Sequence, residues 1–184
     1  MPRSVLTATV GQVAIEIIIA DITTVPVDAI VNAANAKLRR GSGVDGAIHR
    51  AAGPQLQIDC NALGGCVTGS AKMTAAYSLP ARHVIHAVGP VWTGDEAEDD
   101  RLLASCYRTA LTLARQHALS SISFPAISTG VYAFPADRAA RIAVATVAAE
   151  LKAGPGSLRR VILCCFSEES ARLHAEAFRE QGLA

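Results

Sequence analysis

The chain of 184 residues has few aromatic side chains and few charges of either sign. Phe, Trp and Tyr make up 4% of the residues, charged residues make up 18%, and the formal net charge is +1. A protein that binds nucleic acid over a wide surface needs a basic footprint and often aromatic platforms for the bases, so that class is disfavoured. The hydrophobic content of 51% also excludes a disordered polar chain.

Long apolar runs and an export signal are missing as well. No run approaches the roughly 20 residues that span a bilayer, and the residues after Met1 lack the apolar core of a signal peptide. We therefore expect a cytoplasmic protein that contacts no membrane. The length suits one domain with a substantial core, and we expect residues 1–184 to form a single domain.

The sequence also has no Cys or His residues at a spacing that is typical of metal sites. The five cysteines are an odd number, which is typical of reduced thiols in a chain without an export signal. Adjacent Cys164 and Cys165 point to opposite faces of a strand, and so do His83 and His86. The other cysteines have no second pair that would complete a zinc site. We expect no metal and no cofactor.

Three common motifs are absent from the glycine-containing segments. The segment 41–43 belongs neither to G-x-G-x-x-G nor to a Walker sequence, which disfavours dinucleotide oxidoreductases and nucleoside triphosphatases. Neither Ser42 nor Ser128 lies in a G-x-S-x-G elbow, which disfavours a serine hydrolase.

Apolar runs alternate along the chain with segments whose apolar residues have helical spacing. The expected strands are 13–19, 29–31, 71–75, 84–88, 122–124 and 161–166. The expected helices are 45–52, 54–62, 102–117, 136–152 and 168–180. This alternation predicts an α/β fold with helices on both faces of a sheet. The acidic run 95–100 is predicted to be a solvated loop whose last carboxylates favour the start of the next helix.

The most informative segment is 29–49. An apolar strand ends in Asn32 and Asn35, a glycine loop follows, and a helix begins near Asp45. A strand, a glycine loop and a helix N-terminus together present backbone N–H groups to a phosphate. Asn35 and Asp45 add an amide and a carboxylate at the edges of this loop. The segment therefore predicts a reaction site as well as an anion site.

Three further side chains near this loop are candidates for a role in the site. Arg39 and Arg40 are either exposed loop residues or cations that attract phosphates, and the sequence favours neither. His49 follows Asp45 by one helical turn and shares its face, so the two are a conceivable base and orienting partner.

A second informative segment, 124–135, again passes from a strand through a small polar loop to a helix. Ser128, Thr129 and Gly130 can turn hydroxyl and N–H groups toward an anion, and Pro135 suits the first helical turn. An ordinary strand-to-helix connection is the alternative. Two such loops at strand ends suit a diphosphate better than a single phosphate.

Asp21 and Phe166 each follow an apolar strand. The Asp21 carboxylate either accepts a hydrogen bond from an adenine amino group or caps the following turn, and the cap is favoured. Phe166 either stacks on a base or joins the core, and the core is the commoner outcome. Ligands of α/β sheets gather beyond the carboxyl ends of the strands, where both residues are expected.

Taken together, these motifs resemble the macrodomain family, and within it the MacroD-type, bacterial O-acetyl-ADP-ribose deacetylase branch. The matching segments, in family order, are 21–23, 27–35, 43–53, 79–80, 84–86, 88–90 and 124–135. The resemblance implies a three-layer α/β/α sandwich around a mixed, mostly parallel sheet of about six strands. It also implies that the ligand is ADP-ribose.

The resemblance implies roles for individual residues. Asp21 and the Ile22 backbone would bind adenine, and Phe166 would stack on it. Asn35 would meet the distal ribose, and Asp45 would be the catalytic carboxylate beside that ribose. The other residues implied to bind substrate are Asn32, Gly41, Ser42, Gly43, Val44, Gly46, Ser128, Thr129, Gly130, Val131 and Tyr132.

The chain departs from the family pattern at three places. Arg40-Gly41-Ser42-Gly43 stands where the family usually has four glycines, which narrows the backbone freedom of the loop. Ala20 replaces a usual glycine before Asp21. Ala133-Phe134 stands where Gly-Tyr is frequent, although Tyr132 is retained.

From the resemblance we expect a metal-independent ester hydrolase that deacetylates O-acetyl-ADP-ribose and removes mono-ADP-ribose esterified to Asp or Glu of proteins. A water near Asp45 would attack the ester, and Asp45 or a substrate phosphate oxygen would take the proton. The partners would be ADP-ribose, its esters and mono-ADP-ribosylated proteins. Two alternatives stay open. A non-catalytic ADP-ribose-binding module is disfavoured by the Asn35–Asp45 pair, and an RNA-associated regulator by the low charge and aromatic content.

Overall fold

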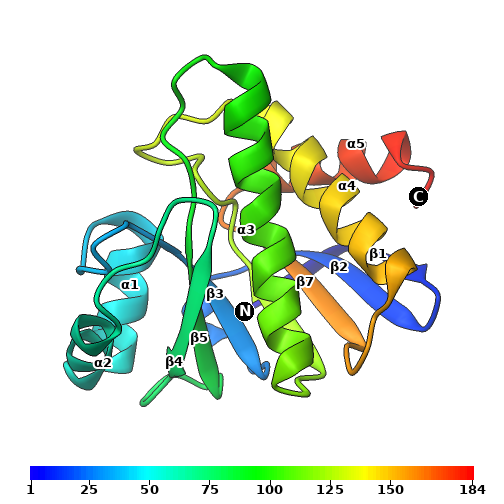
Figure 1. Ribbon diagram of the computed structural model, residues 1–184. Coiled ribbons are helices and arrows are strands. Elements are labelled where there is room, and N and C mark those ends of the chain that lie inside the picture. Colours follow the sequence, from blue (N-terminus) through cyan, green and yellow to red (C-terminus); the bar gives the residue numbers. More distant parts are fainter.

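A seven-stranded mixed sheet forms the centre of the computed structural model, which describes residues 1–184 (Figure 1). The strands lie in the order β1-β2-β7-β6-β3-β5-β4. Their bounds are β1 Arg3–Val10, β2 Val13–Ile19, β3 Ala29–Ala34, β4 Ala71–Ala75, β5 His83–Val88, β6 Ser121–Phe124 and β7 Arg160–Cys165. The helices are the 3-10 turn η1 Ile22–Thr24, α1 Gly43–Ala52, α2 Gln55–Leu63, α3 Glu96–Gln116, α4 Ala136–Ala153 and α5 Glu168–Glu180.

The five central strands run parallel, and an antiparallel strand closes each edge of the sheet. β1 pairs antiparallel with β2, and β4 with β5, whereas the remaining pairs are parallel. Nearly every residue of β3 and β7 is buried, because helices cover both faces of these strands. The expected mixed, mostly parallel sheet is confirmed, with seven strands rather than about six.

The additional strand is β1, which the sequence did not reveal. Most of its side chains are exposed, because it is an edge strand whose outer face meets solvent. Its apolar residues therefore alternate too weakly to indicate a strand. Gly11, with a φ of +59°, and Gln12 form the tight turn that joins β1 to β2, where Val10 pairs with Val13.

The prediction of a loop over the acidic run 95–100 was wrong. α3 begins at Glu96, so most of the run is helical. Asp95 caps the helix, because its Oδ1 accepts a hydrogen bond from the N–H of Glu98 at 3.3 Å. Acidic side chains at this end are stabilised by the free N–H groups and the helix dipole, which outweigh their mutual repulsion.

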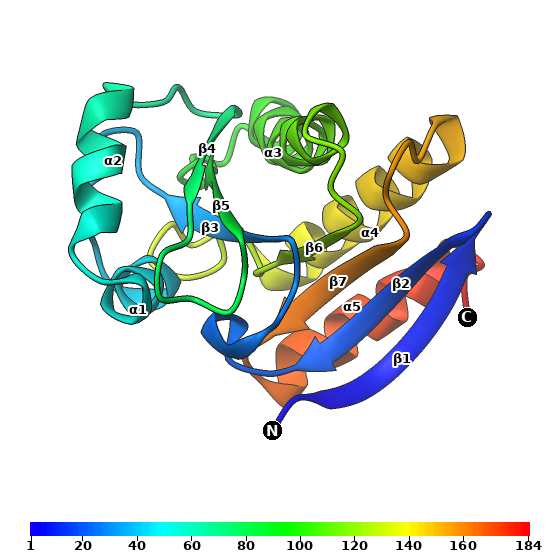
Figure 2. The ribbon, with the colours of Figure 1, turned by 90° about the horizontal axis from the view of Figure 1, so that it is seen from below.

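Helices cover both faces of the sheet (Figure 2). α1 and α2 pack on one face, where Ile48 and Leu56 are fully buried with Ile30 and Val84. α3, α4 and α5 pack on the other face, around a larger core that includes Phe178. The expected three-layer α/β/α sandwich is confirmed. None of the helices has the length and apolar character needed to cross a bilayer.

The carboxyl ends of β2, β7, β6 and β3 lie side by side along one edge of the sheet. From β3 the chain continues through α1, α2 and β4 to β5 on one side. From β6 it continues through α4 to β7 on the other side. The connections therefore diverge between β3 and β6. Such a switch point is where open α/β sheets bind ligands.

Phe178 provides a test of the larger core. Its side chain is fully buried between α5 and the sheet. Phe178→Ala should lower the free energy of unfolding in urea by about 3–5 kcal/mol, because it removes apolar contacts and leaves a cavity. Phe166→Ala is the matched control, since Phe166 is 87% exposed, and it should change stability by less than about 0.5 kcal/mol. Equal losses in the two variants would contradict this packing.

Candidate functional site

A cavity of about 320 Å³ lies at the switch point, between the loops that follow β3 and β6. Of the residues predicted from the sequence, the cavity is lined by Asn35, Gly41, Ser42, Gly43, Val44, Asp45, Ser128, Gly130, Val131 and Tyr132. Those outside the lining are Asp21, Ile22, Asn32, Gly46, Thr129 and Phe166. Both small-residue loops therefore face one space, although more than 80 residues of chain separate them.

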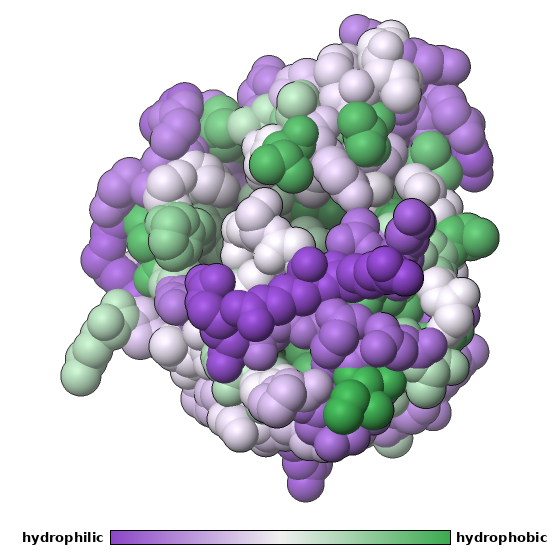
Figure 3. All heavy atoms as spheres, turned by 90° about the vertical axis from the view of Figure 1, so that its left-hand side faces the viewer, coloured by the Kyte–Doolittle hydropathy of each residue, from purple (hydrophilic) through white to green (hydrophobic).

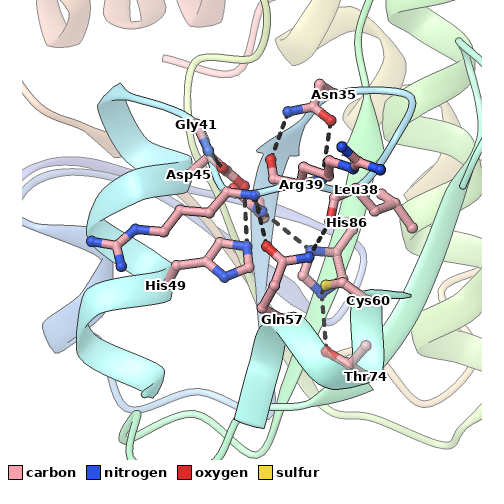
Figure 4. Close-up of polar contacts among 12 residues, drawn as sticks. Asn35, Leu38, Arg39, Gly41, Asp45, His49, Gln57, Cys60, Thr74 and His86 are labelled. Atoms are coloured by element: carbon pink, nitrogen blue, oxygen red, sulfur yellow. Dashed lines mark hydrogen bonds and ion pairs between the residues drawn. The ribbon is translucent and has the colours of Figure 1, made fainter. Parts of the chain in front are cut away.

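Asp45 is the only acidic side chain that lines this cavity. It lies in the first turn of α1, and its side chain is 8% exposed. One carboxylate oxygen, Oδ1, accepts a hydrogen bond from Nδ2 of Asn32 at 2.6 Å. The other, Oδ2, accepts one from the backbone N–H of Gly41 (Figure 4). A carboxylate accepts about four hydrogen bonds, so lone pairs remain for a ligand or a water.

A chain of buried polar groups continues behind Asp45. Asn32 and His86 are direct partners in the register of β3 and β5. Nδ2 of Asn32 lies 3.2 Å from Nδ1 of His86, and Nε2 of His86 lies 2.9 Å from Oγ1 of Thr74. The Thr74 hydroxyl donates to the carbonyl of Ala75. Asn32 is the donor to His86, so these donors assign His86 as the neutral tautomer with its proton on Nε2.

Burial keeps the titratable groups around Asp45 neutral. Desolvation and, to a smaller extent, nearby His49 lower the pKa of His86 to about 4. Desolvation also lowers the pKa of His49, against the opposing pull of Asp45, whose Oδ1 lies 3.6 Å from His49 Nε2. The thiol of Cys60, 3.7 Å from His86 Nε2, has a pKa raised to about 11 by burial and then by Asp45. A thiolate nucleophile is therefore disfavoured here.

Asn35 lies at the rim of the cavity, but its amide is occupied by the protein. Its Oδ1 accepts a hydrogen bond from the N–H of Arg39 at 3.1 Å, and its Nδ2 donates to the carbonyl of Arg39 at 2.7 Å (Figure 4). Asn35 and Asp45 thus hold the same loop from its two ends, at residues 39 and 41. This loop-holding role was not anticipated from the sequence.

The start of α1 provides backbone donors to the cavity. Ser42 precedes the helix, and its side chain makes no capping hydrogen bond. The first N–H groups of a helix have no partner within it, so they are available to an anion. Gly46 allows the loop to pass close by, because a Cβ at this position would lie 2.7 Å from the carbonyl oxygen of Gly41. Gly46 therefore affects the position of the loop without lining the cavity itself.

The loop after β6 approaches the cavity from the opposite side. Ser128 has a φ of +66°, unusual for a residue with a side chain, and its buried Oγ has no hydrogen-bond partner in the protein. A Cβ at Gly89 would lie 2.2 Å from this Oγ, so only glycine fits there. Thr129 instead donates its hydroxyl to the carbonyl of Ala126 at 2.7 Å, which stabilises the turn.

Asp21 and Phe166 lie next to each other, outside the cavity lining. They follow β2 and β7, where Ile19 pairs with Cys165. Asp21 caps the 3-10 turn, because its Oδ1 accepts hydrogen bonds from the N–H and hydroxyl of Thr23. The capping interpretation is therefore realised. The core interpretation of Phe166 was wrong, since its ring is exposed.

Two residues that belong to the site were given no role from the sequence. His86 was considered only as a metal ligand, and Gly89 only as part of a motif. A usable signal existed for His86, because it and Asn32 are polar residues at matching positions in two mostly apolar strands. No group of three or more His, Cys, Asp or Glu side chains is arranged to hold a metal ion.

The model of the Macro domain family matches residues 31–143, which include both loops of the cavity. The chain belongs to this family. A macro domain-containing protein from Chlorobaculum tepidum is 54% identical to this macrodomain over 166 residues, covering 90% of this chain and 96% of that protein. A protein from an Enterobacter species, named O-acetyl-ADP-ribose deacetylase, is 49% identical over 173 residues, covering 92% and 96%.

Solved structures show the same architecture. The Oceanobacillus iheyensis macrodomain with ADP has a TM-score of 0.93 to this chain at 39% sequence identity, and the alignment covers 98% of this chain and 97% of that one. At this similarity the two chains share one fold over nearly their whole length.

The neutral state of His86 predicts a pH dependence of stability. Its folded pKa of about 4 lies below the ordinary value of 6.5, so the folded state resists protonation. The free energy of unfolding should therefore fall as the pH drops from 6.5 to 4, by about 3 kcal/mol from this group. His86→Gln should flatten this fall, which urea titrations at several pH values measure.

His83→Gln, the same change three residues earlier in β5 at a partly exposed position, is the control. His49 and His174 also have lowered pKa values, so part of the slope should remain in the His86 variant. An unchanged slope in His86→Gln would contradict the neutral, buried state.

Proposed function

We propose that this macrodomain is a hydrolase that cleaves acyl esters of ADP-ribose. The observation that carries the proposal is the buried carboxylate of Asp45, which lies in one cavity with the free N–H groups of α1 and the small-residue loop after β6. A ligand whose diphosphate binds these N–H groups would therefore lie next to Asp45, which can activate a water. The relative named O-acetyl-ADP-ribose deacetylase supports the same chemistry.

The ligand would lie across the carboxyl ends of four parallel strands. Adenine would lie at β2 and β7, between Asp21 and the exposed ring of Phe166. The distal ribose would lie at β3, beside Asp45 and below Tyr132. Three strand spacings of about 4.8 Å each separate the two ends, or roughly 14 Å. The diphosphate would lie midway, between the two loops, beside Ser128.

In the proposed reaction a water adds to the ester carbonyl. The bond between the acyl carbon and the ribose oxygen breaks, the acyl group leaves as a carboxylic acid, and the ribose oxygen is protonated. Asp45 or a phosphate oxygen of the substrate takes the proton from the water. The loops contribute by fixing the diphosphate and, through it, the distal ribose.

The substrates we propose are O-acetyl-ADP-ribose and ADP-ribose esterified to Asp or Glu of proteins. Both are esters of the distal ribose, so the same carboxylate and the same loops serve both. The acyl part differs greatly in size between them. A small acetyl group needs no room beyond the cavity, whereas a protein acceptor must continue outside it.

The second candidate function is an ADP-ribose-binding module without turnover. The contacts of Asn35 and Asp45 favour it, because both side chains already bond to the loop backbone and have a structural task there. The lone pairs that remain on Asp45 favour the hydrolase. The two functions differ in whether these residues affect turnover or only binding.

Alanine variants of the two residues separate these functions. Asp45→Ala should lower the kcat of O-acetyl-ADP-ribose hydrolysis by about 10²–10⁴-fold, the usual effect of removing a general base. Asn35→Ala should lower it less, because it acts through the loop, and the double variant should be less than additive. Calorimetry should show a much smaller loss of ADP-ribose affinity.

Asp59→Ala is the matched control, because Asp59 lies on α2 and is not among the residues that line the cavity. If Asp45→Ala keeps full turnover, the catalytic assignment is wrong. If the unaltered protein binds ADP-ribose but hydrolyses neither ester, the binding module is correct.

The adenine position has its own test at Asp21. Asp21→Ala should weaken ADP-ribose binding by about 1.5–3 kcal/mol, the value of a hydrogen bond to a charged group, and should leave ribose 5-phosphate binding unchanged. Asp21→Asn keeps an oxygen that can cap the turn, and it should lose less. Calorimetry with both ligands measures this. Equal losses for the two ligands would place Asp21 away from adenine.

A further inference from the structure

A second cavity lies beside the first, on the other side of the same loop. It is an open groove of about 700 Å³ between residues 36–40 of the loop and one face of α2. Lys37, Arg39 and Arg40 line one side, and the amides of Gln57 and Asn61 line the other. The lining contains no acidic side chain and no aromatic one.

The three cations of the groove are free to bind a ligand. All three are exposed, and none takes part in an ion pair. Eight of the other basic side chains do have acidic partners, so this cluster is left unneutralised. The face that carries α1 and α2 is crossed by a band of hydrophilic side chains (Figure 3).

The backbone of the groove is fixed in place. The N–H of Arg40 donates to Oε1 of Gln57 at 2.7 Å, and Nε2 of Gln57 donates to the carbonyl of Leu38 at 3.0 Å. Leu38 itself is buried and anchors the loop in the core beneath. The cations therefore project from a preorganised loop, which lowers the entropy cost of binding a partner.

The groove and the reaction cavity share one loop. Residues 33–35 and 41–45 line the cavity, whereas residues 36–37 and 39–40 line the groove. Asn35 joins the two, because its amide holds the backbone of Arg39. A polypeptide attached to the distal ribose beside Asp45 would start close to this loop, because Asp45 contacts the loop at Gly41. The groove on the same loop is therefore within reach of such an acceptor.

We propose that this groove binds the acceptor polypeptide of the modified substrate and selects an acidic one. The proposal rests on the proposed function, and it names the class of protein substrate. Three unpaired cations complement the carboxylates of an acidic segment, whereas the amide of Gln57 is already used to hold the loop. A nucleic acid fits less well, because the groove has no aromatic side chain for stacking bases and its cations span only four residues.

The test compares two synthetic peptides that carry ADP-ribose on one glutamate, one with acidic and one with neutral flanking residues. The variant is Lys37→Gln with Arg39→Gln, which leaves Arg40 near His49 unaltered. For the acidic peptide, kcat/KM should fall about three- to tenfold, mostly through KM, as expected for losing two exposed charge pairs. Hydrolysis of the neutral peptide and of O-acetyl-ADP-ribose should stay within twofold.

The control is Arg108→Gln with Lys152→Gln, which removes two exposed, unpaired cations from α3 and α4 and changes the net charge equally. It should leave all three substrates unaffected. For the unaltered protein, the preference for the acidic peptide should also shrink as salt rises, since exposed charges are screened.

Three results would contradict the proposal that this groove binds an acidic acceptor. These are no preference for the acidic peptide, equal losses on acidic and neutral peptides in the variant, and a stronger, variant-sensitive preference for an ADP-ribosylated oligonucleotide. The affinities of both peptides are measured by calorimetry as well. If the protein turns over neither peptide, the proposed hydrolysis of protein esters fails, while the difference in affinity still decides the role of the groove.

Discussion

The burial of one carboxylate organises this macrodomain's site. A charge removed from water must be compensated by hydrogen bonds, and Asp45 obtains them from Asn32 in β3 and from the N–H of Gly41 in the loop. The first contact ties α1 to the sheet, and the second fixes the loop beside the cavity. The hydrogen bonds of this single carboxylate therefore hold β3, the loop and α1 in place relative to one another.

The same requirement explains the neutrality of its surroundings. Asn32 can donate to both Asp45 and His86 only while His86 presents an unprotonated Nδ1. A proton at that nitrogen would break the contact and place a charge in an apolar interior. The buried network thus keeps a carboxylate next to histidines that do not neutralise it, which leaves its lone pairs available on the side of the cavity.

The sequence predicted the fold well where periodicity was strong. The central strands were recognised because burial on both faces makes them continuously apolar, as in β7. β1 was not predicted because an edge strand exposes most of its side chains. The first turn of α3 was not predicted because a capping residue followed by acidic side chains resembles a polar loop.

The candidate site was predictable to the extent that it consists of local motifs. Both small-residue loops contribute to one cavity, as their positions after β3 and β6 suggested. The contacts of Asn35 and His86 depend on distances across strands and loops, which spacing along the chain does not encode. The exposure of Phe166 depends on which segments happen to cover the end of β7.

The sheet order has a consequence for how the site comes into existence. Its parts come from positions as distant in the chain as Asp21 and Phe166, and they become neighbours only through pairing of β2 with β7, β7 with β6, and β6 with β3. Such pairing joins segments that are far apart in the chain, and non-local contacts of this kind form slowly during folding. We therefore expect ligand binding to report on the finished sheet rather than on any one of its segments.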